Sequence, residues 1–153
     1  MSKSISHVVL HLVFVTKFRQ PFILPQVEKD LYAYIITVCE NVQCEVIAIG
    51  GYYEHIHILC FLSRKIAIMK LAEKVKSNSS RWIKSRADFL KDFEWQEGYA
   101  VFSARVKDIP QLKTYILNQK SHHKEMEFSH NNQNFIRIHS NEPLRATSDV
   151  QPL

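Results

Sequence analysis

The chain has 153 residues, of which 46% are hydrophobic, and a formal net charge of +5. These values fit one domain with a single core and an anionic partner such as nucleic acid, without identifying that partner. With only three glycines, the sequence has no glycine-rich phosphate loop. The three cysteines lack paired spacing, which indicates reduced thiols. The apolar run near the N-terminus, about nine residues, is too short to cross a bilayer.

The first half of the chain predicts a strand, a helix and a hairpin. Residues 8–16 are rich in β-branched and aromatic side chains and end at the polar "KFRQP", which is typical of a strand. Pro25 stands near the start of a helix over residues 26–42, where apolar side chains recur at helical spacing. Residues 44–51 and 53–62 predict two strands that lie close enough in sequence to form a hairpin.

The second half predicts two helices around a further strand. Residues 66–87 carry an apolar stripe at helical spacing, and residues 99–106 have the composition of a strand. Residues 108–126 predict a third helix, with Asp108 as its N-cap and Pro110 in its first turn.

This order of elements, β-α-β-β-α-β-α, indicates an α+β fold. Its first six elements follow the split βαβ pattern of ferredoxin-like and RRM-like domains, a four-stranded antiparallel sheet with two helices on one face. No repeat or linker interrupts the sequence. We therefore expect one domain over residues 1–139, with the C-terminal helix added to it, and a flexible tail over residues 140–153.

The stretch "GGYYEHIHILCFL" places His55 and His57 in the middle of an apolar strand. Side chains two residues apart share one face of a strand, so both imidazoles point the same way and could converge on one cation. The alternative is that one ring bonds a backbone carbonyl and the other reaches solvent.

The third predicted helix carries matching chemistry. Tyr115 and Gln119 are four residues apart and therefore lie on one helix face. The phenol could serve as a nucleophile and the amide oxygen as a third metal ligand. The alternative is that Tyr115 is an aromatic at the edge of the core and Gln119 a solvated polar residue.

Together these motifs resemble the HUH single-tyrosine transposases of small bacterial and archaeal insertion sequences, including the REP-associated tyrosine transposases. The resemblance covers nearly the whole chain. It rests on "HLVFVTKFRQP", "EHIHIL", "KVKSNSSRWIK", "FEWQEGYAVFSARV" and "YILNQKSHHKEMEF", in this order. The histidine pair alone is a weak signal, and its combination with the Tyr-x-x-x-Gln helix is a specific one.

The resemblance implies a chemistry and its residues. His55, His57 and Gln119 would bind Mg²⁺ or Mn²⁺, and Tyr115 would attack single-stranded DNA to give a 5′-phosphotyrosine intermediate, without ATP. It also implies DNA with hairpin ends as substrate, and a homodimer in which the tyrosine helix of one subunit can complete the site of the other. We expect such a protein in a prokaryotic cytoplasm, near the nucleoid.

Basic side chains supply candidate DNA contacts. The second predicted helix is strongly basic and interleaves its charges with Trp82 and hydroxyl groups, although a charge run is more often a solvated face. The residues we select as DNA contacts are Lys17, Arg19, Lys70, Lys74, Lys76, Ser79, Arg81 and Lys84.

Four further side chains stand near the predicted site. Glu54 could orient a metal-binding histidine, and His11 shares the strand that should neighbour the histidine strand. His122 and His123 end the third predicted helix, where a role at the helix C-terminus is the default.

Two other functions remain open from the sequence. A relaxase or replication-initiator nickase would use the same histidines and tyrosine, but such enzymes usually carry additional domains. A non-catalytic RRM-like module would read bases with aromatic side chains on the sheet, where this sequence has histidines instead.

Overall fold

The computed structural model describes residues 3–121. Its strands and helices occur in the predicted order. They are β1 (Val9–Val15), α1 (Pro25–Asn41), β2 (Val46–Tyr52), β3 (His55–Phe61), α2 (Ile68–Lys84), β4 (Ala100–Ala104) and α3 (Ile109–Leu117), with single 3₁₀ turns at Lys17–Arg19, Asp88–Leu90 and Val106–Asp108. This confirms the α+β, ferredoxin-like prediction.

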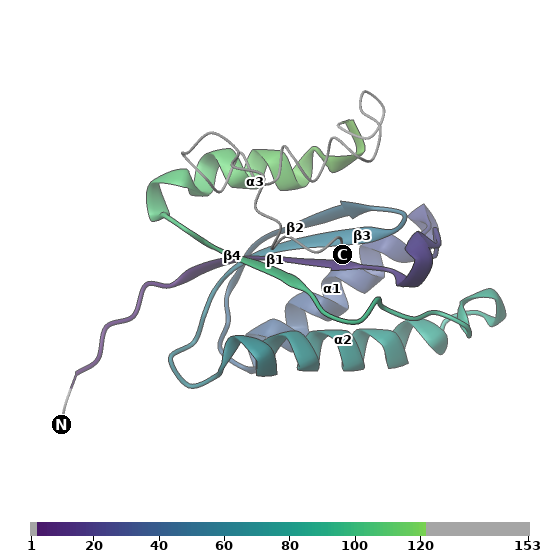
Figure 1. The fold of residues 1–153 in the computed structure, drawn as a ribbon, viewed down its shortest axis with the longest axis horizontal. Coiled ribbons are helices and arrows are strands. Elements are labelled where there is room, and N and C mark those ends of the chain that lie inside the picture. Colours follow the sequence, from purple (N-terminus) through teal and green to yellow (C-terminus); the bar gives the residue numbers. More distant parts are fainter. Residues whose placement is uncertain (1–2, 122–153) are drawn as a thin grey trace, which may run out of the picture.

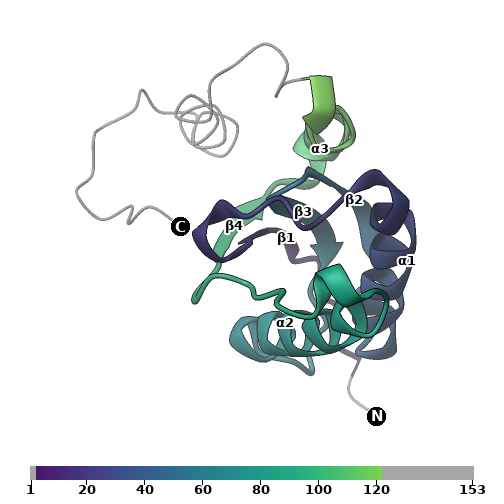
Figure 2. The ribbon, with the colours of Figure 1, turned by 90° about the vertical axis from the view of Figure 1, so that its right-hand side faces the viewer.

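The strands form one antiparallel sheet in the order β2-β3-β1-β4, so β3 and β1 are central. Helices α1 and α2 cover one face of the sheet, and α3 covers the other (Figures 1 and 2). The sheet is therefore the middle layer of three. Because both of its faces are covered, every residue of β1 is buried.

Alternation along β3 divides its side chains between two cores. Ile56, Ile58 and Cys60 belong to the larger core under α1 and α2. Leu59 belongs to the smaller core under α3, together with Leu112 and Ile116. His55 and His57 have the same parity as Leu59, so the two histidines lie beneath α3.

A glycine lets α3 approach the sheet closely. A Cβ atom added at Gly50 of β2 would collide with the carbonyl oxygen of Ile116 in α3. The backbone of the helix thus lies against the backbone of the strand, which a residue with a side chain would prevent.

The third helix begins at the predicted position, but it is interrupted within its predicted range. Its α-helical part ends at Leu117, and Asn118 has φ −99° and ψ 19° before a helical turn resumes at Gln119. Asp108 stands at the N-cap position, but its carboxylate is paired with the guanidinium of Arg105 at 2.8 Å. The expected cap is therefore replaced by an ion pair within the preceding turn.

The larger core also contains all three cysteines of the sequence as free, buried thiols. Burial raises the pKa of Cys39 to about 12, and it raises the pKa of Cys60 as well. These thiols behave as small apolar side chains, in agreement with the predicted structural role.

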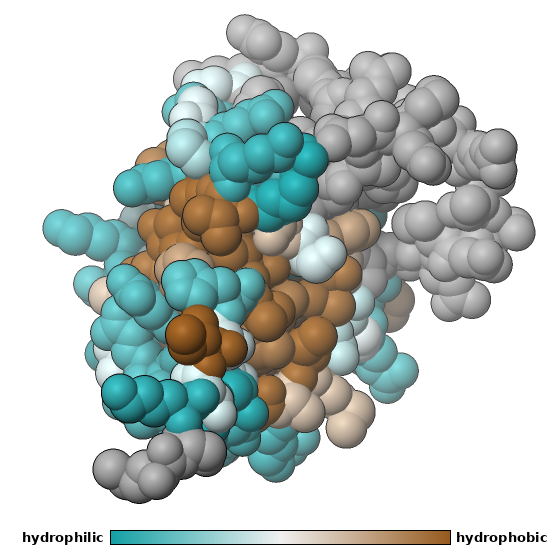
Figure 3. All heavy atoms as spheres, turned by 90° about the vertical axis from the view of Figure 1, so that its left-hand side faces the viewer, coloured by the Kyte–Doolittle hydropathy of each residue, from teal (hydrophilic) through white to brown (hydrophobic). Residues whose placement is uncertain are grey.

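One end of the molecule is apolar. Hydrophobic side chains gather on the face shown in Figure 3, the side of Figure 1 where the N-terminal segment and the start of α3 lie. Ile5, Val8 and Val106 are exposed large apolar residues of these segments. The start of β3, which carries His55, lies at the other end of the sheet.

Candidate active site

Three elements bring the predicted site residues together. His55 and His57 come from β3, and Tyr115 comes from α3, which lies over that face of the sheet. Gln119 comes from the helical turn that follows α3. The ring centroids of His55 and His57 are 5.0 Å apart, and those of His57 and Tyr115 are 5.7 Å apart. Residues separated by about sixty positions in sequence therefore meet in one chain, beneath a helix that shields them from solvent.

His57 has a histidine partner on the neighbouring strand. Nδ1 of His57 lies 2.8 Å from Nε2 of His11 in β1, and both side chains are buried. One ring must donate the hydrogen bond and the other must accept it, which fixes the orientation of both. Because Nδ1 of His57 is engaged in this bond, Nε2 is the nitrogen through which His57 would bind a cation.

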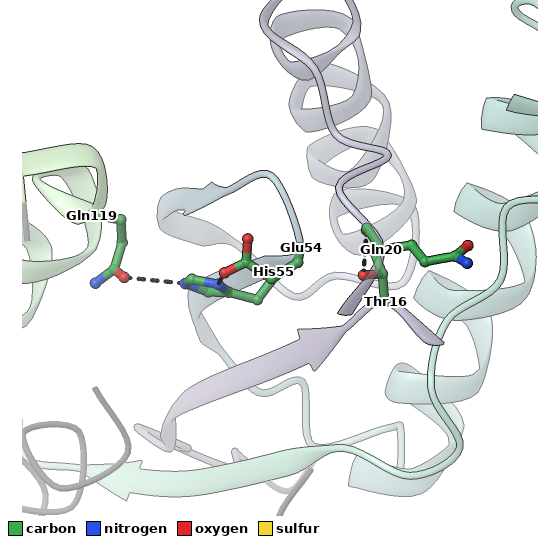
Figure 4. A network of polar contacts seen from close by, with 5 residues as sticks. All are labelled: Thr16, Gln20, Glu54, His55 and Gln119. Atoms are coloured by element: carbon green, nitrogen blue, oxygen red, sulfur yellow. Dashed lines mark hydrogen bonds and ion pairs between the residues drawn. The ribbon is translucent and has the colours of Figure 1, made fainter. Parts of the chain in front are cut away.

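His55 lies between a carboxylate and an amide. Its Nδ1 is 3.0 Å from Oε1 of Glu54, and its Nε2 is 3.2 Å from Oε1 of Gln119 (Figure 4). The carboxylate can only accept a hydrogen bond from Nδ1, as in the carboxylate–histidine pairs that orient metal ligands. Glu54 therefore occupies the position that the sequence suggested for an orienting group.

The end of α3 fixes the orientation of the Gln119 amide. Nε2 of Gln119 donates a hydrogen bond to the carbonyl oxygen of Tyr115, at 3.1 Å, so its other atom, Oε1, faces His55. Lys120, the next residue, forms an ion pair with Glu28 of α1 at 2.9 Å. The segment that carries Gln119 is thus attached both to the helix before it and to the opposite layer.

Tyr115 is buried against these groups, with 8% of its surface exposed. Burial raises the pKa of its phenol, and a hydrogen bond with the Gln119 side chain lowers that pKa in part. The neutral phenol is therefore favoured in the protein alone. Attack by Tyr115 would require a group that stabilises the phenolate or takes its proton.

The donor atoms at this site fit a divalent cation. If Nδ1–H of His55 donates to Glu54, its Nε2 and the Gln119 oxygen face each other at 3.2 Å as two acceptors, an arrangement that a cation between them would stabilise. Two imidazole nitrogens and one amide oxygen suit a metal with open positions. Within residues 3–121, no group of three or more His, Cys, Asp or Glu side chains could hold a metal ion.

Comparison with known proteins places the chain in a family. The model of the family described as "Transposase IS200 like" matches residues 4–119. The chain belongs to this family. A comparison with curated proteins finds no match.

Two solved structures share the fold of this transposase. One is a protein assigned as a transposase from Deinococcus radiodurans R1, with a TM-score of 0.64 and 22% identity, covering 78% of this chain and 98% of its own. The other is a REP-associated tyrosine transposase bound to a REP hairpin, with a TM-score of 0.62 and 17% identity, covering 100% of this chain and 99% of its own. Within the part of the transposase that the structure describes, no helix is long and apolar enough to cross a membrane.

The basic residues predicted as DNA contacts fall into different environments in the transposase. The prediction that Ser79 contacts DNA is wrong. Ser79 is buried in the core, where its hydroxyl donates to the Val75 carbonyl and accepts a hydrogen bond from Trp95 at 2.9 Å. A residue in this position cannot contact DNA. Lys76 also acts within the fold, because its ammonium donates to the carbonyls of Gln96 and Gly98 at 2.7 and 2.8 Å.

The other predicted contacts lie closer to the surface. Lys17 is paired with Glu94 at 2.8 Å, and Lys70 lies 3.4 Å from Glu73. The remaining members of the set are Arg19 and Lys74, which are partly exposed, and Arg81 and Lys84, which are exposed. Helix α2 covers the face of the sheet opposite α3, so its basic side chains and the histidine site belong to different layers.

Some predictions concern residues that the structure does not describe, and some structural features were not predicted. His122, His123 and the predicted tail over residues 140–153 lie outside the described residues. The contact between Gly50 and α3 is not predicted above, although a glycine inside a strand signals close approach of another backbone. The left-handed turn at Phe18 is not predicted either, because the sequence offers no glycine there.

Proposed function

We propose that this transposase cleaves and rejoins single-stranded DNA through a covalent bond to Tyr115, with a divalent cation held by His55, His57 and Gln119. The observation that carries the proposal is the meeting of both imidazoles, the phenol and the amide oxygen beneath α3. The family of the chain supports a reaction on DNA.

The reaction would be an in-line displacement at phosphorus. The Tyr115 oxygen attacks the scissile phosphate, the bond from phosphorus to the 3′ oxygen breaks, and the phenol proton leaves while the 3′ oxygen gains a proton. When bound, Mg²⁺ or Mn²⁺ would polarise a non-bridging phosphate oxygen and offset the negative charge that repels the phenolate. The products are a 5′-phosphotyrosine and a free 3′-OH.

The covalent bond conserves the energy of the phosphodiester. A second 3′-OH can therefore attack the phosphotyrosine, release the Tyr115 phenol and join the strands, without ATP. This reversibility distinguishes strand transfer from hydrolysis.

The protein's own groups would prepare the site for this step. His11 orients His57, and Glu54 orients His55, so Nδ1 of each imidazole is engaged and Nε2 is the nitrogen that would bind the cation. Gln119 contacts both His55 and the carbonyl of Tyr115, and it thereby ties the position of the nucleophile helix to the metal site.

The DNA would be a single strand with hairpin ends. The supporting observation is the similarity to a transposase whose structure contains a REP hairpin. We also propose a homodimer. Tyr115 already lies beside His57 of its own chain, so completion of a partner's site would require α3 to leave the contact with Gly50.

The structure weakens the main alternative of a non-catalytic RRM-like module. Such a module reads bases on an open sheet face. Here α1 and α2 cover one face and α3 covers the other.

A labelling experiment tests the proposal. Single-stranded hairpin DNA labelled at its 3′ end should give a labelled covalent adduct with the protein in Mg²⁺ or Mn²⁺. The same DNA labelled at its 5′ end should give a shorter free strand. Tyr115→Phe should abolish both products, and Tyr34→Phe is the matched control, because Tyr34 stacks on Trp82 on the other side of the sheet. An adduct with Tyr115→Phe, or an adduct that retains the 5′ label, would contradict the proposal.

A further inference from the structure

The turn that follows β1 exposes an aromatic ring through an unusual backbone. Phe18 has φ 56° and Arg19 has φ 55°, both in the left-handed region that non-glycine residues rarely occupy. Phe18 is 82% exposed. Neither the strain nor the exposure of a large apolar side chain helps the fold, and such outliers occur at functional sites.

The turn is held firmly in this conformation. The Thr16 hydroxyl donates to the Gln20 carbonyl at 2.7 Å (Figure 4), and the Arg19 amide donates to the Thr16 carbonyl at 2.9 Å. The Lys17 amide donates to the Glu94 carbonyl at 2.9 Å, which attaches the turn to the segment before β4. The ring is therefore presented by an ordered backbone.

Phe18 lines a cavity of about 330 Å³ between this turn and residues 84–94. Three lysines line it as well, Lys17, Lys84 and Lys91, against the two acids Asp92 and Glu94. Lys17 and Glu94 neutralise each other in a 2.8 Å ion pair. The cavity thus combines an exposed aromatic ring with lysines at its rim, as sites that bind single-stranded nucleic acid do.

The cavity lies near the proposed site of chemistry. Val15 at the end of β1 is opposite His55 in the sheet, and the Thr16 amide donates to the Glu54 carbonyl at 2.8 Å. Phe18 follows Val15 by three residues, which span at most about 10 Å. A strand whose phosphate is held at His55 could therefore reach Phe18 within a few nucleotides.

We propose that Phe18 is a stacking platform for one unpaired base of the DNA strand, with Lys84 and Lys91 binding the phosphates beside that base. This inference rests on the proposed function in one respect, that the substrate is single-stranded DNA. It adds a subsite outside the histidine and tyrosine cluster.

The test measures binding rather than cleavage. In the full chain carrying Tyr115→Phe, single-stranded hairpin oligonucleotides contain 2-aminopurine at one position at a time in the unpaired flank. Stacking on Phe18 should quench the fluorescence at one position. Phe18→Ala should abolish that quenching and weaken binding by about 5- to 150-fold, the range expected for loss of one stacked base. Phe18→Trp should retain both.

Controls separate stacking from folding. Phe18→Gly removes the ring but adopts φ 56° without strain, so it should lose the quenching while the protein stays folded. Phe89→Ala removes another exposed phenylalanine, 54% exposed, and should bind normally. Lys84→Ala and Lys91→Ala should each reduce the slope of log affinity against log salt by about 1, whereas Lys29→Ala on α1 should not.

Binding and quenching within two-fold of the parent for both Phe18→Ala and Phe18→Gly would overturn the inference. That outcome would leave the proposed function intact, because the covalent adduct is measured separately and depends on Tyr115. Conversely, absence of the covalent adduct would contradict the proposed function and would leave the binding result unchanged.

Discussion

His11 and His57 face each other across two neighbouring strands, with Nε2 of one 2.8 Å from Nδ1 of the other. Groups that hydrogen-bond a metal-binding histidine fix its tautomer and typically contribute about 10- to 100-fold to metal affinity. If the proposed cation binds at His57, His11 would act on it through that hydrogen bond.

His11→Ala should raise the metal concentration needed for half-maximal adduct formation by about 10- to 100-fold. His11→Gln, whose amide oxygen can still accept a hydrogen bond from Nδ1–H of His57, should recover part of the loss. The measurement is adduct yield as a function of Mn²⁺ concentration, with the exposed His7 changed to Ala as the control. An unchanged metal dependence in His11→Ala would contradict a positioning role.

We expect Gln119 to contribute to metal binding through its side-chain oxygen. Gln119→Leu removes both the oxygen that faces His55 and the donor to the Tyr115 carbonyl. It should reduce adduct formation most strongly at low metal concentration. Gln119→Glu keeps an oxygen in place and should retain activity at a lower metal concentration than Gln119→Leu requires. Gln111→Leu, an exposed change in α3, is the control. Equal metal dependence in all three variants would exclude Gln119 as a ligand.

Gly50→Ala should displace α3, the helix that carries Tyr115, because the added methyl group would collide with the carbonyl of Ile116. We expect adduct formation to fall at least about ten-fold, the effect of misplacing reacting groups by a fraction of an ångström or more. Gly98→Ala is the control: its φ is +82°, and among the described residues no atom lies within 4 Å of the added Cβ. It should cost about 1–2 kcal/mol of unfolding free energy and leave adduct formation per folded molecule unchanged. The opposite pattern would refute this account of Gly50.

Lys76 should contribute to stability rather than to DNA binding. Burial lowers the pKa of its ammonium, which donates to two carbonyls of the segment before β4. Lys76→Met should reduce the free energy of unfolding by about 1–3 kcal/mol and leave the salt dependence of DNA binding unchanged. The exposed Arg81, changed to Met, should do the reverse if it contacts phosphate. Thermal unfolding and binding at several salt concentrations would measure both, and a smaller salt slope in Lys76→Met would contradict the assignment.

Local sequence patterns were sufficient for the elements and for the faces of the side chains. The two-residue period of a strand placed His55 and His57 together, and the four-residue spacing on a helix did the same for Tyr115 and Gln119. The same helical period places Ser79 on the buried face of α2, so its burial could have been predicted. Leu71, Val75, Ser79 and Ile83 form one stripe at intervals of four, and all are buried.

Other features depend on contacts that no local pattern encodes. The bond from His11 to His57 depends on the register between β1 and β3. No glycine marks the left-handed turn at Phe18 in the sequence. Its conformation depends on hydrogen bonds that the Thr16 hydroxyl donates to the Gln20 carbonyl and the Lys17 amide donates to the Glu94 carbonyl. The end of α3 at Leu117 is marked only by Asn118, a residue that helices also tolerate internally.

The buried cysteines have a practical consequence. Since all three thiols are buried, maleimide reagents should leave Cys39, Cys44 and Cys60 unmodified in the folded protein. The natural chain is therefore ready for site-specific labelling, and Leu117→Cys would place one dye on the exposed side of α3. Energy transfer between donor-labelled and acceptor-labelled molecules could then report, in real time, whether helices exchange between subunits as strands are joined.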